Sequence, residues 1–150
     1  MSQAPPLGPG RVELPPLAEA LSKLDLRDDQ YAIRFVDQLL AEAITARASD
    51  IHLQPTPQGF AIRWRIDGVL QPVGEFPRGE KTDPATRLKV LARLLTYRTD
   101  VPQEGRLAAP EGREMRVSSF PALFGERVVV RIFASDTSLQ TLPDLGLPPE

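Results

Sequence analysis

Residues 101–133 constrain the fold most, because three strand-like runs alternate there with turn signals. The runs are GRLAA, REMRVSSF and ERVVVRIF, and they are separated by Pro110-Glu111-Gly112 and by residues 121–125. Glycine beside a polar residue supplies the positive φ that a tight turn requires. This stretch therefore predicts an antiparallel meander of three strands.

The same meander is rich in arginine. Side chains alternate between the two faces of a strand, so in the last run Val128 and Val130 share one face, and Arg127 and Arg131 share the other. A sheet of this size has to bury one face, so its arginines are either ordinary solvated residues or converge on an anion. The fork of guanidinium donors matches phosphate oxygens. The arginines of the meander are Arg106, Arg113, Arg116, Arg127 and Arg131.

Two helices are predicted upstream of the meander. Residues 30–48 show helical periodicity, and Asp28 or Asp29 can cap their start. The expected apolar stripe consists of Ile33, Val36, Leu40, Ala43 and Ile44. A second helix begins at Asp83-Pro84, a favourable N-cap followed by proline at the first helical position. Its expected stripe consists of Leu88, Leu91, Ala92 and Leu95.

Three further strands lie between these helices. Residues 51–55 form a short strand, and Phe60–Ile66 alternates with Trp64 inward and Arg63 and Arg65 outward. Asp67-Gly68 is a hairpin turn that leads into a partner strand over residues 69–76. The chain therefore predicts an α+β fold, a mainly antiparallel sheet of about six strands packed with two main helices.

Composition excludes several classes of protein. Hydrophobic residues make up 41% of the 150-residue chain and charged residues 25%, which is typical of a globular domain. The net charge of −2 argues against a general nucleic-acid binder. No cysteine is present, and the single histidine, His52, leaves no multi-histidine metal site. We therefore expect no bound metal. No apolar run approaches the roughly 20 residues of a membrane span, so we expect a cytoplasmic chain.

Two other candidate sites are weaker. Residues 74–82 read GEFPRGEKT, close to a phosphate-binding loop, but Glu80 separates the second glycine from Lys81. We interpret this stretch as a connecting loop. His52 and Asp50 are expected on one strand face, as a structural pair or as part of a catalytic triad whose nucleophile the sequence does not identify. Neither site yields a catalytic assignment.

The order of several motifs resembles a known family. ASDIHLQP, IRWRIDGVL, RLKVLARL, VPQEGR, MRVSSFP and FGERVVVRI occur in sequence with compatible spacing between about Tyr31 and Leu147. They are similar to the N-terminal domain that precedes the motor domain in type II secretion and type IV pilus assembly ATPases. One departure is Gln54, where the family usually has an acidic residue.

The resemblance implies a PAS-like domain that lies beside a RecA-like ATPase domain of the same or a neighbouring subunit. It also implies that the full-length protein forms a homo-hexamer at the inner-membrane secretion platform. It implies that Arg106, Arg116 and, less directly, Arg131 reach the phosphates of ATP held with Mg²⁺ by the motor domain. The chain has no Gly-Lys pair and hence no Walker A loop. We therefore expect no ATP hydrolysis and no cofactor when it acts alone.

The domain boundaries follow from the proline-rich composition of the two ends of the chain and from the resemblance. We expect a Pro-rich flexible leader with a short helix over residues 1–28, the PAS-like domain over residues 29–134, and an exit linker toward an absent motor domain over residues 135–150. The family's further N-terminal domain, which docks on the membrane platform, is also expected to be absent. The alternative is a stand-alone PAS-like interaction or sensor module with no role in ATP turnover.

Overall fold

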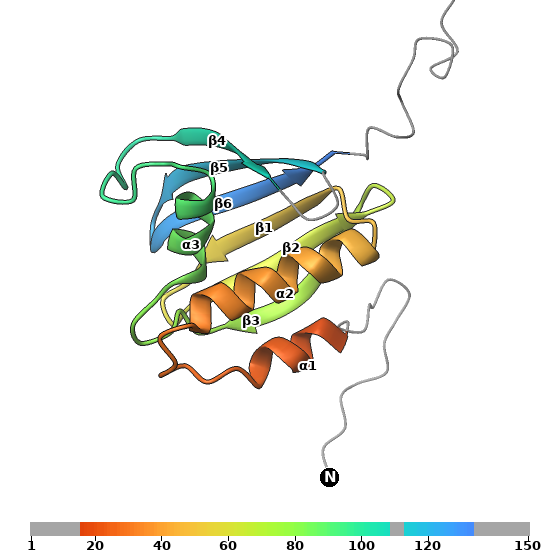
Figure 1. Ribbon diagram of the computed structural model, residues 1–150, viewed down its shortest axis with the longest axis horizontal. Helices are drawn as coiled ribbons and strands as arrows, with labels where there is room; N and C mark the ends of the chain where they lie inside the picture. The colour runs from red at the N-terminus through yellow and green to blue at the C-terminus, as the bar shows by residue number, and fades with distance from the viewer. Residues whose placement is uncertain (1–15, 109–112, 134–150) are drawn as a thin grey trace, which may run out of the picture.

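The computed structural model describes residues 16–108 and 113–133, which form three helices and six strands (Figure 1). In chain order the elements are α1 Pro16–Ser22, α2 Tyr31–Thr45, β1 Asp50–Pro55, β2 Phe60–Ile66, β3 Val69–Phe76, α3 Pro84–Leu91, β4 Gln103–Ala108, β5 Glu114–Ala122 and β6 Gly125–Ile132. The α+β prediction is confirmed. The predicted leader up to residue 15, the turn at residues 110–112 and the exit linker lie outside the described residues.

The six described strands form one antiparallel sheet in the order β3-β2-β1-β6-β5-β4. Asp67 and Gly68 have φ values of 51° and 79° between β2 and β3, the left-handed geometry of the predicted two-residue hairpin. The pairing of β1 with β6 joins the first and last strands at the centre of the sheet. This pairing places the predicted meander next to the upstream strands.

All three described helices pack on the same side of this sheet (Figure 1). Phe35 of α2 is fully buried, and its ring contacts those of Tyr31, Phe60 and Phe76 at centroid distances of 5.3–5.7 Å. Trp64 is buried in the core, as predicted. We call the opposite side, which none of these helices covers, the open face. None of the described helices is long and apolar enough to cross a membrane.

The predicted stripe and cap of α2 are partly wrong. Phe35 and Leu39 are fully buried, whereas Ile33 is only partly buried. The helix contacts both α1 and α3, so its buried face is wider than a single stripe. Asp28 does not cap the helix either, because its Oδ1 accepts a hydrogen bond from the N–H of Gln30, the residue at the N-cap position, at 2.9 Å.

Helix α3 differs from the prediction at its C-terminal end. Asp83 is the N-cap as expected, and its carboxylate accepts a hydrogen bond from Ala85 N–H at 3.2 Å. The helix ends at Leu91, so Leu95 lies beyond it and is exposed. The buried face of α3 instead includes Lys89, a charged residue that an apolar pattern cannot identify.

Candidate functional site

A row of charged side chains crosses five strands of the open face. The strand register places Arg65 of β2 opposite Asp50 of β1, and Asp50 opposite Arg131 of β6. Arg131 in turn lies opposite Arg116 of β5, which lies opposite Arg106 of β4. Directly opposed residues have neighbouring side chains on one face of a sheet. The three arginines predicted from the sequence are therefore consecutive members of one row, and we call Arg106, Arg116 and Arg131 the arginine row.

The position of Arg106 depends on the glycine before it. A Cβ atom on Gly105 would lie 2.5 Å from the carbonyl oxygen of Ala92, immediately after α3. Only a residue without a side chain allows β4 to approach this segment so closely. Because residues alternate along the strand, Gly105 faces the helices while Arg106 faces the open side.

Carboxylates accompany the arginine row. Asp50 is 16% exposed; its Oδ2 accepts from Arg65 Nε at 3.2 Å and its Oδ1 lies 4.0 Å from Arg131 Nε. Glu114 Oε2 lies 3.3 Å from Arg116 Nε and 3.5 Å from Arg106 Nε. These carboxylates reduce the repulsion between neighbouring cations in the row.

A hollow of about 270 Å³ lies over part of the row. The Arg116 guanidinium also lies 5.9 Å from the centroid of the Phe133 ring, within the range of a cation–π contact. The hollow thus combines two arginines with an aromatic surface. Its lining residues are Glu104, Arg116, Ser118, Val129, Arg131 and Phe133.

The other two arginines of the meander are not in the row. Arg127 is paired with Phe120 near the β5–β6 turn, and its guanidinium lies 5.5 Å from the centroid of that ring. Arg113 precedes β5. The structure therefore brings together the three arginines singled out by the family resemblance and separates them from Arg127.

His52 lies on the open face beside Asp50, as alternation predicts. Its Nε2 is 3.8 Å from Asp50 Oδ2, which is longer than a hydrogen bond. Partial burial lowers the pKa of His52, Asp50 opposes this shift, and the positive charges of Arg127 and Arg65 add to it. This arrangement favours a neutral imidazole and lacks the tight His–Asp contact of a catalytic triad.

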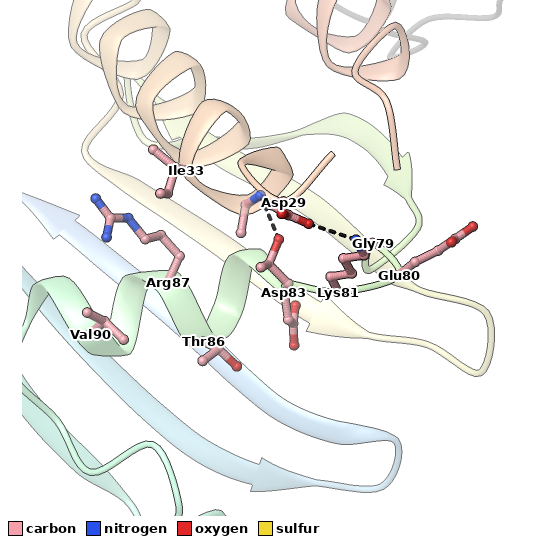
Figure 2. Close-up of a pocket in the computed structure, with 11 residues that line it drawn as sticks. Asp29, Ile33, Gly79, Glu80, Lys81, Asp83, Thr86, Arg87 and Val90 are labelled. Atoms are coloured by element: carbon pink, nitrogen blue, oxygen red, sulfur yellow. Dashed lines mark hydrogen bonds and ion pairs between the residues drawn. The ribbon is translucent and has the colours of Figure 1, made fainter. Parts of the chain in front are cut away.

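The loop with the approximate phosphate-binding pattern borders a larger cavity of about 480 Å³ between α2 and α3 (Figure 2). Lys81 is paired with Asp29 at 2.9 Å, and the N–H of Glu80 donates to the carbonyl of Leu26 at 3.0 Å. Burial raises the pKa of Asp83 in the same cavity. The lysine and this backbone donor are thus already engaged, and residues 77–83 are a connecting loop.

The sequence did not point to the two carboxylates beside the arginine row, Asp50 and Glu114, or to the buried Lys89. Asp50 was considered only as a partner of His52, because the pairing of β1 with β6 is not visible in the sequence. Glu114 is two positions from Arg116, and this spacing alone would have placed both on one strand face. Among the described residues, no group of three or more His, Asp or Glu side chains is arranged to hold a metal ion.

Comparison with known proteins identifies the family of this chain. The family model described as "Type II/IV secretion system protein" matches residues 25–150. The chain belongs to this family. It is 36% identical to type II secretion system protein E of Pseudomonas aeruginosa, with 98% of this chain and 30% of that protein covered. It is 34% identical to the type IV pilus assembly ATPase PilB of Acinetobacter baylyi, with 83% of this chain and 22% of that protein covered.

This type II/IV secretion system family member thus spans less than a third of these two relatives. A crystal structure of the pilus retraction motor PilT with bound ADP overlaps 66% of this chain and 29% of that chain, with 21% identity and a TM-score of 0.46. That distant overlap does not bear on the arginine row.

Proposed function

We propose that this family member is the non-catalytic N-terminal domain of a type II secretion or type IV pilus assembly ATPase. In this proposal Arg106, Arg116 and Arg131 contact the phosphates of ATP that a RecA-like motor domain binds with Mg²⁺. The observation that carries the proposal is the cross-strand register, which aligns these three arginines on the open face. Guanidinium groups arranged in this way suit the charge that develops on a transferred phosphoryl group.

The wider context is part of the same proposal. The motor domain belongs to the same or a neighbouring subunit of a homo-hexamer, and the assembly works in the cytoplasm at the inner-membrane secretion platform. The names of the relatives support this context, because they include a secretion protein and a pilus assembly ATPase. The domain supplies arginines and intersubunit contacts and does not hydrolyse ATP by itself. Phosphate release by the 150-residue chain in ATP and Mg²⁺ would contradict that last point.

The test uses a longer protein that carries this domain together with its motor domain. Arg106→Ala and Arg116→Ala should each remove most of its ATPase turnover, because an arginine that stabilises the transition state contributes about 10³–10⁵ in kcat. Arg63→Ala is the matched control, because Arg63 is an exposed arginine of the open face outside the row. All three variants should fold like the parent. Unchanged turnover in both row variants would refute the assignment.

A second candidate is an interaction or sensor module with no role in ATP turnover. The cavity between α2 and α3 favours it, because about 480 Å³ is within the range of small-ligand sites. Ile33 and Val90 give this cavity an apolar part, and Arg87 borders it (Figure 2). A ligand that raises the melting temperature of the chain, together with unchanged ATPase turnover in the row variants, would favour this candidate.

A further inference from the structure

One carboxylate oxygen links two members of the arginine row. Oε2 of Glu114 lies 3.3 Å from Nε of Arg116 and 3.5 Å from Nε of Arg106. The register makes Arg106 and Arg116 direct cross-strand neighbours, and Glu114 lies two positions from Arg116 on the same face of β5. Glu114 therefore occupies the space between the two guanidinium groups.

A phosphate oxygen would need the same space. Carboxylate and phosphate oxygens accept hydrogen bonds from guanidinium in the same way, so the two groups compete for the same donors. Glu104 adds a weaker contact, with its Oε2 3.9 Å from a terminal nitrogen of Arg116. An anion that binds both arginines must consequently displace Glu114 or share the guanidinium groups with it.

The exposure of these side chains indicates that Glu114 is displaceable. The side chains of Arg106, Arg116 and Glu114 are 69%, 45% and 40% exposed, and ion pairs with this exposure contribute little to stability. Asp50 is different, because it is largely buried between Arg65 and Arg131. Asp50, at the Arg131 end of the arginine row, is thus held in place by burial. Glu114, at the Arg106 and Arg116 end, is exposed and exchangeable.

We propose that Glu114 is an internal counter-ion that holds the phosphate-binding position of Arg106 and Arg116 until a polyphosphate displaces it. This inference rests on the proposed function and specifies how the site is regulated. In the empty state Glu114 limits repulsion between the two arginines. In the occupied state the polyphosphate takes over that role, so the binding affinity is reduced by the competition with Glu114.

The first test measures binding of inorganic tripolyphosphate to the 150-residue chain by calorimetry at 0.15 M salt. Glu114→Gln should bind about three- to fivefold more tightly than the parent, because it keeps the side-chain size and removes the competing charge. Glu75→Gln is the matched control; Glu75 is exposed on β3 opposite Ala61, several strands from Arg116. At this salt concentration charges farther apart than about 8 Å are largely screened, so the control should stay within about twofold of the parent.

A second readout examines the ion pair without any anion. The Nε–H signals of Arg106 and Arg116 in nuclear magnetic resonance spectra should shift in Glu114→Gln and remain unchanged in Glu75→Gln. A double variant, Glu114→Gln with Arg116→Ala, should lose the gain in tripolyphosphate affinity. Both results require that Glu114 acts through these arginines.

Equal tripolyphosphate affinity of the parent and Glu114→Gln, including no detectable binding by either, would overturn the counter-ion proposal. An equal gain in Glu75→Gln would also overturn it, because the effect would then be one of net charge. The proposed function fails separately, when Arg106→Ala and Arg116→Ala leave the ATPase turnover of the motor-containing protein intact. Loss of that turnover together with equal affinities would reject only the role of Glu114.

Discussion

Nζ of Lys89 lies 2.9 Å from both carboxylate oxygens of Glu126 and joins α3 to β6. The side chains are 1% and 12% exposed, so the ion pair is buried. The same Nζ donates to the carbonyl of Arg98 at 3.0 Å. The ammonium group thus has partners for its donors, as a buried charge requires.

We predict that Lys89→Met lowers the free energy of unfolding by about 3–5 kcal/mol, because it leaves the Glu126 carboxylate buried without its partner. Urea denaturation followed by Trp64 fluorescence measures this change. Lys81→Met is the matched control, because Lys81 forms an exposed pair with Asp29, and it should cost no more than about 1 kcal/mol. Equal stability of the two variants would contradict the prediction. Combining Lys89→Met with Glu126→Leu should recover part of the loss, because no unpaired charge remains.

The lowered pKa of His52 predicts a pH dependence of stability. Between the folded pKa of His52 and its ordinary value of 6.5, the unfolded chain binds a proton that the folded chain does not bind. The free energy of unfolding should therefore rise with pH across this window and level off above 6.5. Urea midpoints between about pH 5 and 8 measure the rise. His52→Gln, in a chain with no other histidine, should remove it.

Asp50 should influence the same titration. Its carboxylate raises the pKa of His52 and opposes the effect of burial. Asp50→Asn should consequently lower the pKa of His52 further. Nuclear magnetic resonance would detect this change, because the chemical shifts of the imidazole ring can be followed as a function of pH. An unchanged or higher pKa would show that the carboxylate does not act on His52.

Gly105→Ala should displace β4 and lower the free energy of unfolding by about 1–3 kcal/mol, because the new methyl group overlaps the carbonyl of Ala92. Backbone amide spectra should show the change at Arg106. Gly68→Ala is a control with a different cause of strain, since the φ of Gly68 is +79° and no heavy atom beyond its two chain neighbours lies within 4 Å of the added Cβ. It should also destabilise the chain while leaving the signals of Arg106 in place. An unperturbed Arg106 in Gly105→Ala would contradict the proposed role of this glycine.

The local patterns predicted most of the elements correctly. Alternation in β2 placed Trp64 inward, and Asp67-Gly68 marked its hairpin, because both features depend on neighbours in the sequence. Predictions of burial on the helices were weaker. Leu95 is exposed because α3 ends before it. Lys89 is buried because it meets Glu126 of β6.

The sequence by itself determined the class of the fold, its hairpins and the family, since periodicity and ordered motifs are local properties. It also singled out Arg106, Arg116 and Arg131, through the resemblance. Only the tertiary structure decided that these arginines form one row, because cross-strand register depends on the pairing of β4, β5, β6 and β1. The same pairing brought Asp50 beside Arg131, although the two residues are 81 positions apart in the chain. A sheet creates such neighbours through backbone hydrogen bonds, which no local pattern of side chains records.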